Sequence, residues 1–194
     1  GKNAFRTSLT INGCLAPLLI GTAVGTFFTG SEFMVNKNAV ADLGAPVISR
    51  WANNWHGLEA VANPFNVEFG LMVMFLAVCL GALYMINNID DDKLATQLRK
   101  SLLICFVGFL IMLVLVLINF ITMEGFAVDA EGNVFMEKGK YFHNLIQMPI
   151  VLIMFLLGAV LLVAGVVLTL VKKEFSRGIW ITGPGVVLAV MAIF

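Results

Sequence analysis

The residues best suited to redox or metal chemistry are two histidines, His56 and His143, and three cysteines. A haem or metal site in a helical bundle needs several histidine, cysteine, methionine or carboxylate ligands that converge at helical spacing. The two histidines are far apart in the sequence, and neither falls midway along an apolar segment. We therefore expect no catalytic residue, no metal and no haem on this chain.

The sulfur-containing residues favour packing over ligation. Cys14, Cys79 and Cys105 all lie inside apolar runs, where a free thiol behaves as a small hydrophobic side chain. Six of the ten methionines are scattered through similar runs, in which methionine fills irregular gaps: Met72, Met74, Met85, Met112, Met148 and Met154. We expect these residues to belong to the packed interior.

Three polar residues near apolar segments are candidates for a proton-linked or partner-facing role. Acidic side chains within a membrane are costly and tend to mark ion or proton pathways. Glu68 and Glu124 stand at the edges of apolar segments, so contact with headgroup water is the simpler interpretation. Asn119 lies deeper, and we expect it to bond across helices. Both interpretations of the two glutamates stay open at this stage.

The composition identifies the solvent that surrounds most of the chain. Of 194 residues, 60% are hydrophobic and 12% are charged, whereas soluble domains have about 25% charged residues. The formal net charge is zero, so no global field would attract nucleic acid. We predict an all-α, polytopic transmembrane helix bundle and no nucleic-acid partner.

Long segments without any charged residue locate the helices. A helix crosses a bilayer with about 20 mostly apolar residues, and the last such segment is short for a full crossing. The sequence also begins without methionine and ends inside an apolar run, so we expect it to be a piece of a longer protein. We predict a single transmembrane region over residues 1–194, with four full spans and one truncated span at about 9–30, 65–89, 98–123, 145–171 and 178–194.

Basic residues predict the orientation, because Lys and Arg accumulate in short cytoplasmic loops. The alternate connections hold eight of the twelve basic residues, at Lys2, Arg6, Lys93, Arg99, Lys100, Lys172, Lys173 and Arg177. We expect these segments to be cytoplasmic. On the other side, Trp51 and Trp55 favour anchoring at the headgroup level. A ligand-binding or partner-binding surface is the alternative for that loop.

The first span has a pattern that favours helix contact. Gly21 and Gly25 form a small-xxx-small motif, which lets two helix backbones approach closely in lipid. We expect these glycines to face another helix.

The order of motifs resembles a known family. The stretch Ala16–Gly25, a polar outer loop and then Asn63-Pro64-Phe65 resemble subunit II of the cytochrome bd quinol oxidases. A charged inner loop, a span opening near Gln147-Met148-Pro149-Ile150 and a last span after Lys172-Lys173 continue the likeness over essentially the whole chain.

This resemblance implies a function, partners and cofactors. The chain would hold the fourth through most of the eighth helix of a nine-helix subunit in the bacterial inner membrane. It would pack against subunit I, which would carry haem b and haem d, and support the reduction of oxygen to water coupled to quinol oxidation. Membrane lipid, the quinone pool and a structural quinone or lipid are the other implied partners. Glu68 departs from the pattern, since an apolar residue is expected there.

Two other classes of protein stay open. A fragment of a secondary transporter would have helices broken by glycine or proline at the midplane, and Gly183-Pro184-Gly185 is a candidate break. A membrane anchor or assembly factor without transport is the third possibility.

Overall fold

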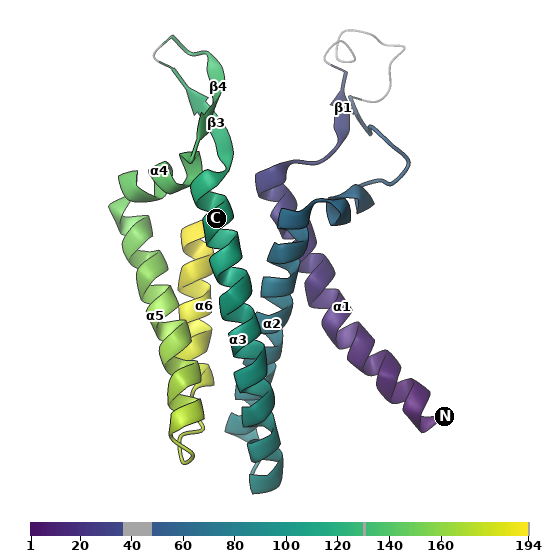
Figure 1. The fold of residues 1–194 in the computed structure, drawn as a ribbon, viewed down its shortest axis with the longest axis vertical. Coiled ribbons are helices and arrows are strands. Elements are labelled where there is room, and N and C mark those ends of the chain that lie inside the picture. The colour runs from purple at the N-terminus through teal and green to yellow at the C-terminus, as the bar shows by residue number, and fades with distance from the viewer. Residues whose placement is uncertain (37–47, 130, 194) are drawn as a thin grey trace. The chain divides into compact units, whose positions relative to one another are not determined.

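The computed structural model describes residues 1–36, 48–129 and 131–193. The chain divides into two compact units, residues 1–74 and residues 75–194, which are described separately. Helices dominate both units, and the strands form two small hairpins (Figure 1). The predicted all-α membrane bundle is confirmed, whereas the single region over residues 1–194 stays a prediction.

The first unit contains α1 (Lys2–Thr29), a small hairpin, a 3₁₀ helix and the beginning of α2 (Pro64–Asn88). The hairpin pairs β1 (Phe33–Val35) with β2 (Ser49–Trp51) in antiparallel register, and the 3₁₀ helix η1 (Leu58–Ala62) follows. Trp51 and Trp55 in this connection are 44% and 67% exposed. Their exposure is compatible with the expected anchoring at the headgroups.

The second unit contains the rest of α2, then α3 (Asp92–Thr122), and ends with a group of shorter and longer helices. An antiparallel hairpin follows α3. The remaining elements are β3 (Glu124–Val128), β4 (Val134–Lys138), α4 (Lys140–Gln147), α5 (Pro149–Val171) and α6 (Ile179–Ile193).

Four helices are long and apolar enough to cross a membrane, namely α1, α2, α3 and α5. Within the described residues α6 is shorter, with 15 residues. The predicted four full spans and one partial span are therefore confirmed. The α1 helix begins several residues earlier than expected, at Lys2.

Local sequence signals explain where two of these helices begin. Pro64 occupies the first turn of α2, where its missing N–H costs nothing, and Asn63 Oδ1 accepts a hydrogen bond from Phe65 N at 3.0 Å. Asp91 caps α3, because its Oδ1 accepts from Lys93 N at 2.9 Å and from Leu94 N at 3.0 Å.

The fourth expected span, 145–171, is divided in the structure. The short helix α4 ends at Gln147, and α5 begins at Pro149 after Met148 in a non-helical conformation. Proline disfavours helical backbone in the residue before it, which accounts for the interruption. The spanning helix therefore starts four residues later than predicted, and α4 lies across its end (Figure 1).

The hairpin after α3 was not foreseen from the sequence. Asp129 organises its turn, since Oδ1 accepts from Glu131 N at 2.9 Å and from Asn133 N at 2.8 Å. These hydrogen bonds, chiefly those from Asn133, hold the pKa of Asp129 below its usual range. Gly132 adopts a positive φ of 86°, a conformation that suits glycine.

Each unit has its own core. In the first unit the ring of Phe28 contacts Phe65 and Phe69, with centroid distances of 6.2 and 6.0 Å. In the second unit the most buried side chains come from four helices: Cys79, Leu83, Leu102, Val116, Val166, Thr169 and Thr182.

The candidate break in the last helix is absent. Residues Gly183, Pro184 and Gly185 all lie within α6, which is helical from Ile179 to Ile193. The interpretation of this motif as a broken transporter helix was therefore wrong. Pro184 is in the second turn of the helix, where its missing N–H removes one intrahelical hydrogen bond without ending the helix.

Candidate functional site

The small-xxx-small motif of Gly21 and Gly25 lies at the contact between α1 and the first part of α2. Gly21 and Gly25 are buried on one face of α1. A Cβ on Gly21 would lie 2.8 Å from Gly70 Cα, and one on Gly25 would lie 2.8 Å from Asn66 Oδ1. The two helices approach so closely that neither position has room for a larger side chain.

A buried amide at this contact was missed by the sequence analysis. Asn66 is 1% exposed, accepts a hydrogen bond from Thr29 Oγ1 at 2.9 Å and donates from Nδ2 to the Ala60 carbonyl at 3.1 Å. Its place four residues before Gly70, on the same helix face, is the signal that could have identified it. Asn66 thus ties the end of α1 and the 3₁₀ helix to the start of α2.

A polar cavity of about 240 Å³ opens beside this amide. Glu32 and Glu59 are among its lining residues. Glu32 Oε2 accepts from Asn53 Nδ2 at 2.8 Å, and Glu59 Oε2 accepts from Gly57 N at 2.9 Å. Space for solvent at this end of two apolar helices fits a position at the membrane surface.

The three polar candidates lie on different elements, Glu68 in the first unit and Asn119 and Glu124 in the second. Glu68 is partly buried in the second turn of α2, where it makes a side-chain interaction. Asn119 is partly buried in α3, and its Nδ2 donates to the Leu115 carbonyl of its own helix at 3.0 Å. Its expected bond to another helix stays a prediction. Glu124 is exposed and begins β3 opposite Lys138, just beyond the end of α3.

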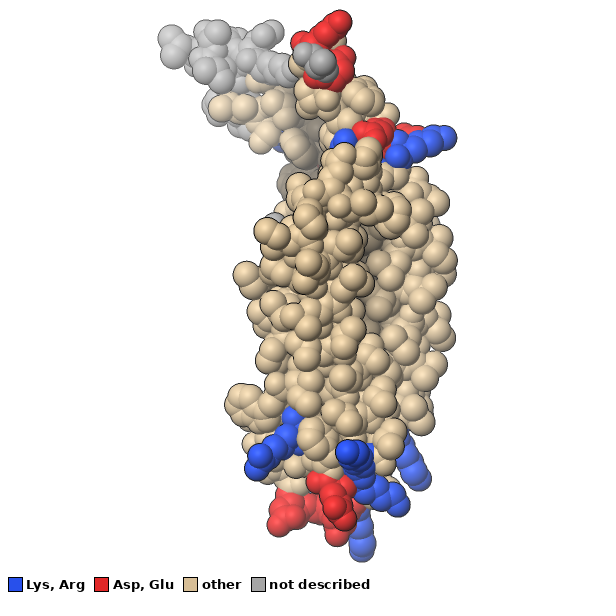
Figure 2. All heavy atoms as spheres, turned by 90° about the vertical axis from the view of Figure 1, so that its left-hand side faces the viewer, with Lys and Arg blue, Asp and Glu red and all other residues tan. Residues whose placement is uncertain are grey.

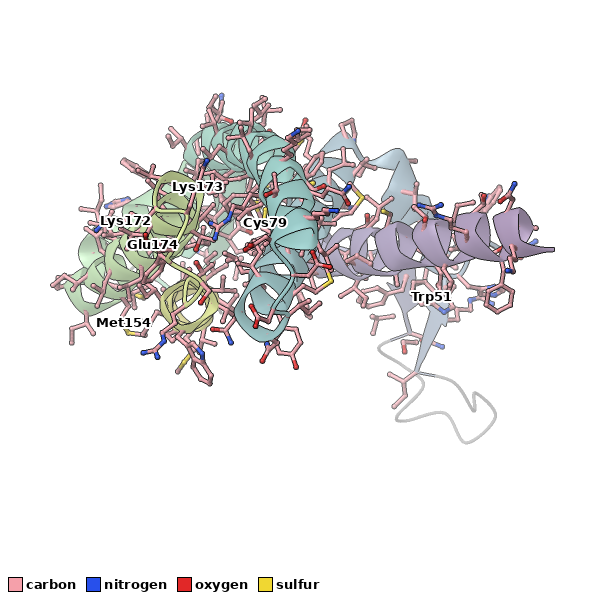
Figure 3. The ribbon with its side chains drawn as sticks, turned by 90° about the horizontal axis from the view of Figure 1, so that it is seen from below. Trp51, Cys79, Met154, Lys172, Lys173 and Glu174 are labelled. Atoms are coloured by element: carbon pink, nitrogen blue, oxygen red, sulfur yellow. The ribbon has the colours of Figure 1, made fainter. Side chains whose placement is uncertain are left out.

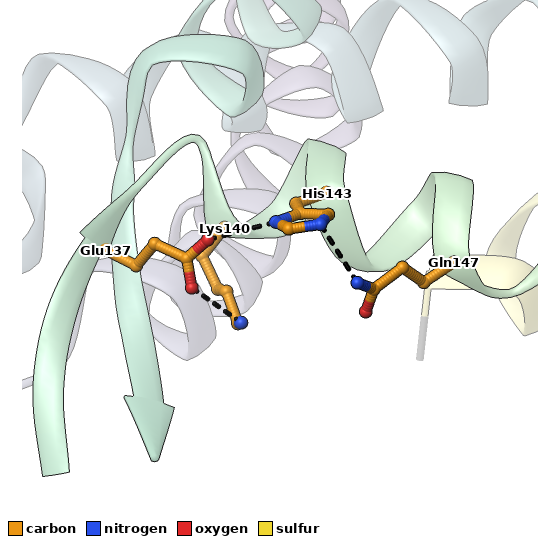
Figure 4. Close-up of polar contacts among 4 residues, drawn as sticks. All are labelled: Glu137, Lys140, His143 and Gln147. Carbon is orange, nitrogen blue, oxygen red and sulfur yellow. Dashed lines mark hydrogen bonds and ion pairs between the residues drawn. The ribbon is translucent and has the colours of Figure 1, made fainter. Parts of the chain in front are cut away.

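The histidine at the start of α4 belongs to a compact polar cluster, which Figure 4 shows. Glu137 Oε1 lies 2.9 Å from His143 Nδ1, and Glu137 Oε2 lies 2.7 Å from Lys140 Nζ. Lys140 first, and then His143, hold the pKa of Glu137 below its usual range. Because a carboxylate only accepts, Nδ1 donates to Glu137 in this arrangement, and Nε2 lies 2.9 Å from Gln147 Nε2 as an acceptor.

The two histidines have different surroundings. Both ring nitrogens of His143 are hydrogen-bonded, one to Glu137 and the other to Gln147. His56 lies in an exposed turn with a positive φ of 51°, outside every helix. Among the described residues, no group of three or more His, Cys, Asp and Glu side chains could hold a metal ion.

The opposite end of the second unit is basic, with Arg99 at its centre. Nη1 of Arg99 donates to the Thr169 carbonyl, and Nη2 donates to the Lys173 carbonyl at 2.6 Å. These bonds join α3 to the turn between α5 and α6, so the two basic connections share one end of this unit. Figure 2 shows Lys and Arg side chains together with acidic side chains where the apolar surface ends.

Between the two polar ends the surface is apolar. Helices α1, α3, α5 and α6 all expose large aliphatic or aromatic side chains, with Phe5, Ile104, Ile150 and Trp180 each at least 70% exposed. Exposed apolar surface on this scale marks contact with lipid or with another protein. The apolar helix surfaces can therefore pack against lipid or another membrane protein, and the polar ends can hold the chain in one orientation across the membrane.

Comparison with known proteins gives the family. The family model described as cytochrome bd terminal oxidase subunit II matches residues 1–194. No curated protein matches the chain. The family match extends over both units and agrees with the four membrane-spanning helices. The chain therefore belongs to the cytochrome bd terminal oxidase subunit II family and is a multi-pass membrane component of a cytochrome bd-type oxidase.

Proposed function

We propose that this chain is the subunit of a bacterial inner-membrane quinol oxidase that binds no haem and packs against subunit I. The family match over the whole chain carries this proposal. The complex would oxidise quinol and reduce oxygen to water, with haem b and haem d held by subunit I.

The geometry of the histidines supports this division of roles. His56 lies in a loop, and both ring nitrogens of His143 already have partners. These surroundings favour placing the haems on subunit I, so we assign no electron-transfer step to this chain. Its own contribution would be to shape and stabilise the complex through its helix surfaces.

The exposed half of α1 is the surface best suited to a partner. Phe5, Leu9 and Ile11 are 73%, 62% and 56% exposed, although they belong to a helix that is long enough to span the membrane. Burial of such side chains against another apolar surface stabilises by about 1.5–3 kcal/mol each when it is complete and the alternative is water. In a membrane the gain comes from packing instead, so the partner must fit their shape.

Difference spectra of the purified complex test the proposal. Haem b and haem d should copurify with this chain, and complexes with His56→Ala or His143→Ala should keep both haem bands at the intensity of the wild type. Loss of a haem band in either variant, with the complex still assembled, would refute the proposed division. Absence of haem from the wild-type complex would refute the oxidase role itself.

A further inference from the structure

The turn between α5 and α6 gathers basic side chains around one hollow. A cavity of about 480 Å³ is lined by Lys172, Lys173, Glu174 and Phe175. Figure 3 shows the labelled side chains of Lys172, Lys173 and Glu174 together at this turn. Arg177, two residues beyond Phe175, is also exposed.

The charges of this turn have no carboxylate partner. Among the described residues, neither lysine nor Arg177 forms an ion pair, although Glu174 lines the same hollow. Three positive charges and one negative charge leave a net positive charge where the apolar surface ends. Such a site attracts an anion, and the attraction is strong where the surroundings are partly apolar.

The backbone of the turn is held in place by Arg99. Its guanidinium donates to the carbonyls of Thr169 and Lys173, at the end of α5 where carbonyl groups lack helical partners. Phe175 N also donates to the Lys172 carbonyl at 3.0 Å and closes the turn. The two lysines are therefore presented from a fixed backbone, which lowers the entropic cost of binding.

Apolar side chains on both sides set the depth of the turn in the bilayer. Val171, the last residue of α5, and Trp180, in the first turn of α6, are each 73% exposed. Tryptophan concentrates at the membrane interface, with its ring at the headgroup level. A ligand of this turn would thus need a negative charge at the lysines and an apolar part beside α5 and α6. A phospholipid has both.

We propose that Lys172, Lys173 and Arg177 form a binding site for the phosphate of an anionic phospholipid, whose acyl chains lie along α5 and α6. The proposal goes beyond the oxidase role, and it depends only on the membrane location of the chain. Lipid binding here would fasten the α5–α6 turn to the membrane surface.

Native mass spectrometry of the purified complex tests this site with added dioleoylphosphatidylglycerol. The wild-type complex should retain this lipid more strongly than dioleoylphosphatidylcholine, whose headgroup is zwitterionic. The double variant Lys172→Gln with Lys173→Gln should weaken lipid retention about tenfold or more. Each lysine near an anionic headgroup adds enough binding free energy that the loss of two changes the affinity on this scale. Both substitutions keep the backbone carbonyl that Arg99 binds at position 173.

Two matched variants separate a local site from a general effect of charge. The variant Lys2→Gln with Lys138→Gln removes the same charge elsewhere and should bind lipid as the wild type does. Lys172→Arg with Lys173→Arg keeps the charge and should also retain the lipid. If the assembled glutamine variant keeps its affinity, or the distant variant loses as much, the proposed site is wrong.

Inorganic phosphate distinguishes a lipid from a free anion. Excess phosphate at constant ionic strength should not displace the bound phosphatidylglycerol, because it lacks acyl chains. Displacement by phosphate, or equal binding of the two lipids, would overturn the proposal of a phospholipid site. None of these results depends on haem content or turnover, so failure here is distinct from failure of the oxidase role.

Discussion

The α5–α6 contact and the α1–α2 contact use glycine in different ways. Between α5 and α6, glycines oppose one another: a Cβ on Gly158 would lie 2.7 Å from the Gly185 carbonyl oxygen, and one on Gly165 would lie 2.7 Å from that of Gly178. Between α1 and α2, Gly21 faces Gly70, but Gly25 faces the larger side chain of Asn66. Where both helices have small residues, their backbones can stay close together along a longer stretch.

The glycine contacts also show which part of each helix takes part. The α5–α6 contact includes Gly158, near the middle of α5, and Thr169, near its end. The α1–α2 contact begins only in the second half of α1, since a Cβ on Gly13 would meet no atom within 4 Å. The pattern in α1 therefore identifies a local contact, and the remaining half is free for lipid or for subunit I.

The largest expected effect is at α6, where Gly185→Ala should destabilise the chain. The added Cβ would lie 2.6 Å from Leu162 N and 2.8 Å from the Gly158 carbonyl oxygen, and backbone atoms cannot rotate away. Overpacking of this kind costs about 1–3 kcal/mol or more. Thermal unfolding of the purified complex should show the loss.

Gly183→Ala is the matched control on the same helix. A Cβ at this position would meet no atom within 4 Å, so the complex should keep its melting temperature. Equal losses in the two variants would mean that the close approach of α5 and α6 does not stabilise the chain.

Gly21→Ala should have an intermediate effect on the α1–α2 contact. The new Cβ would lie 2.8 Å from Gly70 Cα and 2.8 Å from Val73 Cβ, so the helices must separate slightly. We expect a loss of about 1–2 kcal/mol, and a larger loss for Gly21→Leu. The yield of assembled complex in mild detergent measures both.

Gly13→Ala provides the comparison on α1, because its Cβ would point into open space. Alanine is also more favourable than glycine in a helix interior by about 1 kcal/mol, so this substitution should not weaken α1 itself. If Gly13→Ala lowers assembly as much as Gly21→Ala does, subunit I or lipid contacts the first half of α1 as closely as α2 contacts the second.

A smaller effect is expected from the polar part of the same contact. Asn66→Ala removes the hydrogen bonds that Asn66 makes with the Thr29 hydroxyl and the Ala60 carbonyl, at a cost of about 1 kcal/mol. Thr29→Val removes one of these two bonds and should cost less. A double-mutant cycle on thermal stability should give a measurable coupling, and strict additivity would contradict a direct bond.

The smallest effect should come from Glu68→Gln, one helical turn after the start of α2. Glutamine keeps the size of the side chain and one acceptor oxygen, and a carboxylate that reaches headgroup water loses its charge at little cost. Assembly and oxygen consumption should stay near those of the wild type. Normal assembly with slower oxygen reduction at neutral pH would instead indicate a proton-linked role for Glu68.

Much of the fold could be predicted from the sequence, because hydrocarbon imposes one requirement on the whole chain. Backbone groups must be satisfied within each span, so long apolar segments such as 69–89 and 101–123 can only be helices. The charged residues then fix the helix ends to within a few positions, and the cap at Asp91 and the proline at Pro64 act locally. These features depend on neighbouring residues alone.

Only the tertiary structure decided which residues meet. Several polar contacts join residues from different elements. They are the hydrogen bonds of the buried Asn66, those of Arg99 to the α5–α6 turn, and the His143–Glu137 pair. Within the helix at Gly183-Pro184-Gly185, Gly185 lies so close to α5 that an added Cβ would be 2.6 Å from Leu162 N. The apolar segments and helix caps can be recognised from the local sequence. Which helix surfaces pack together depends on the shapes of both helices, which the local sequence does not give.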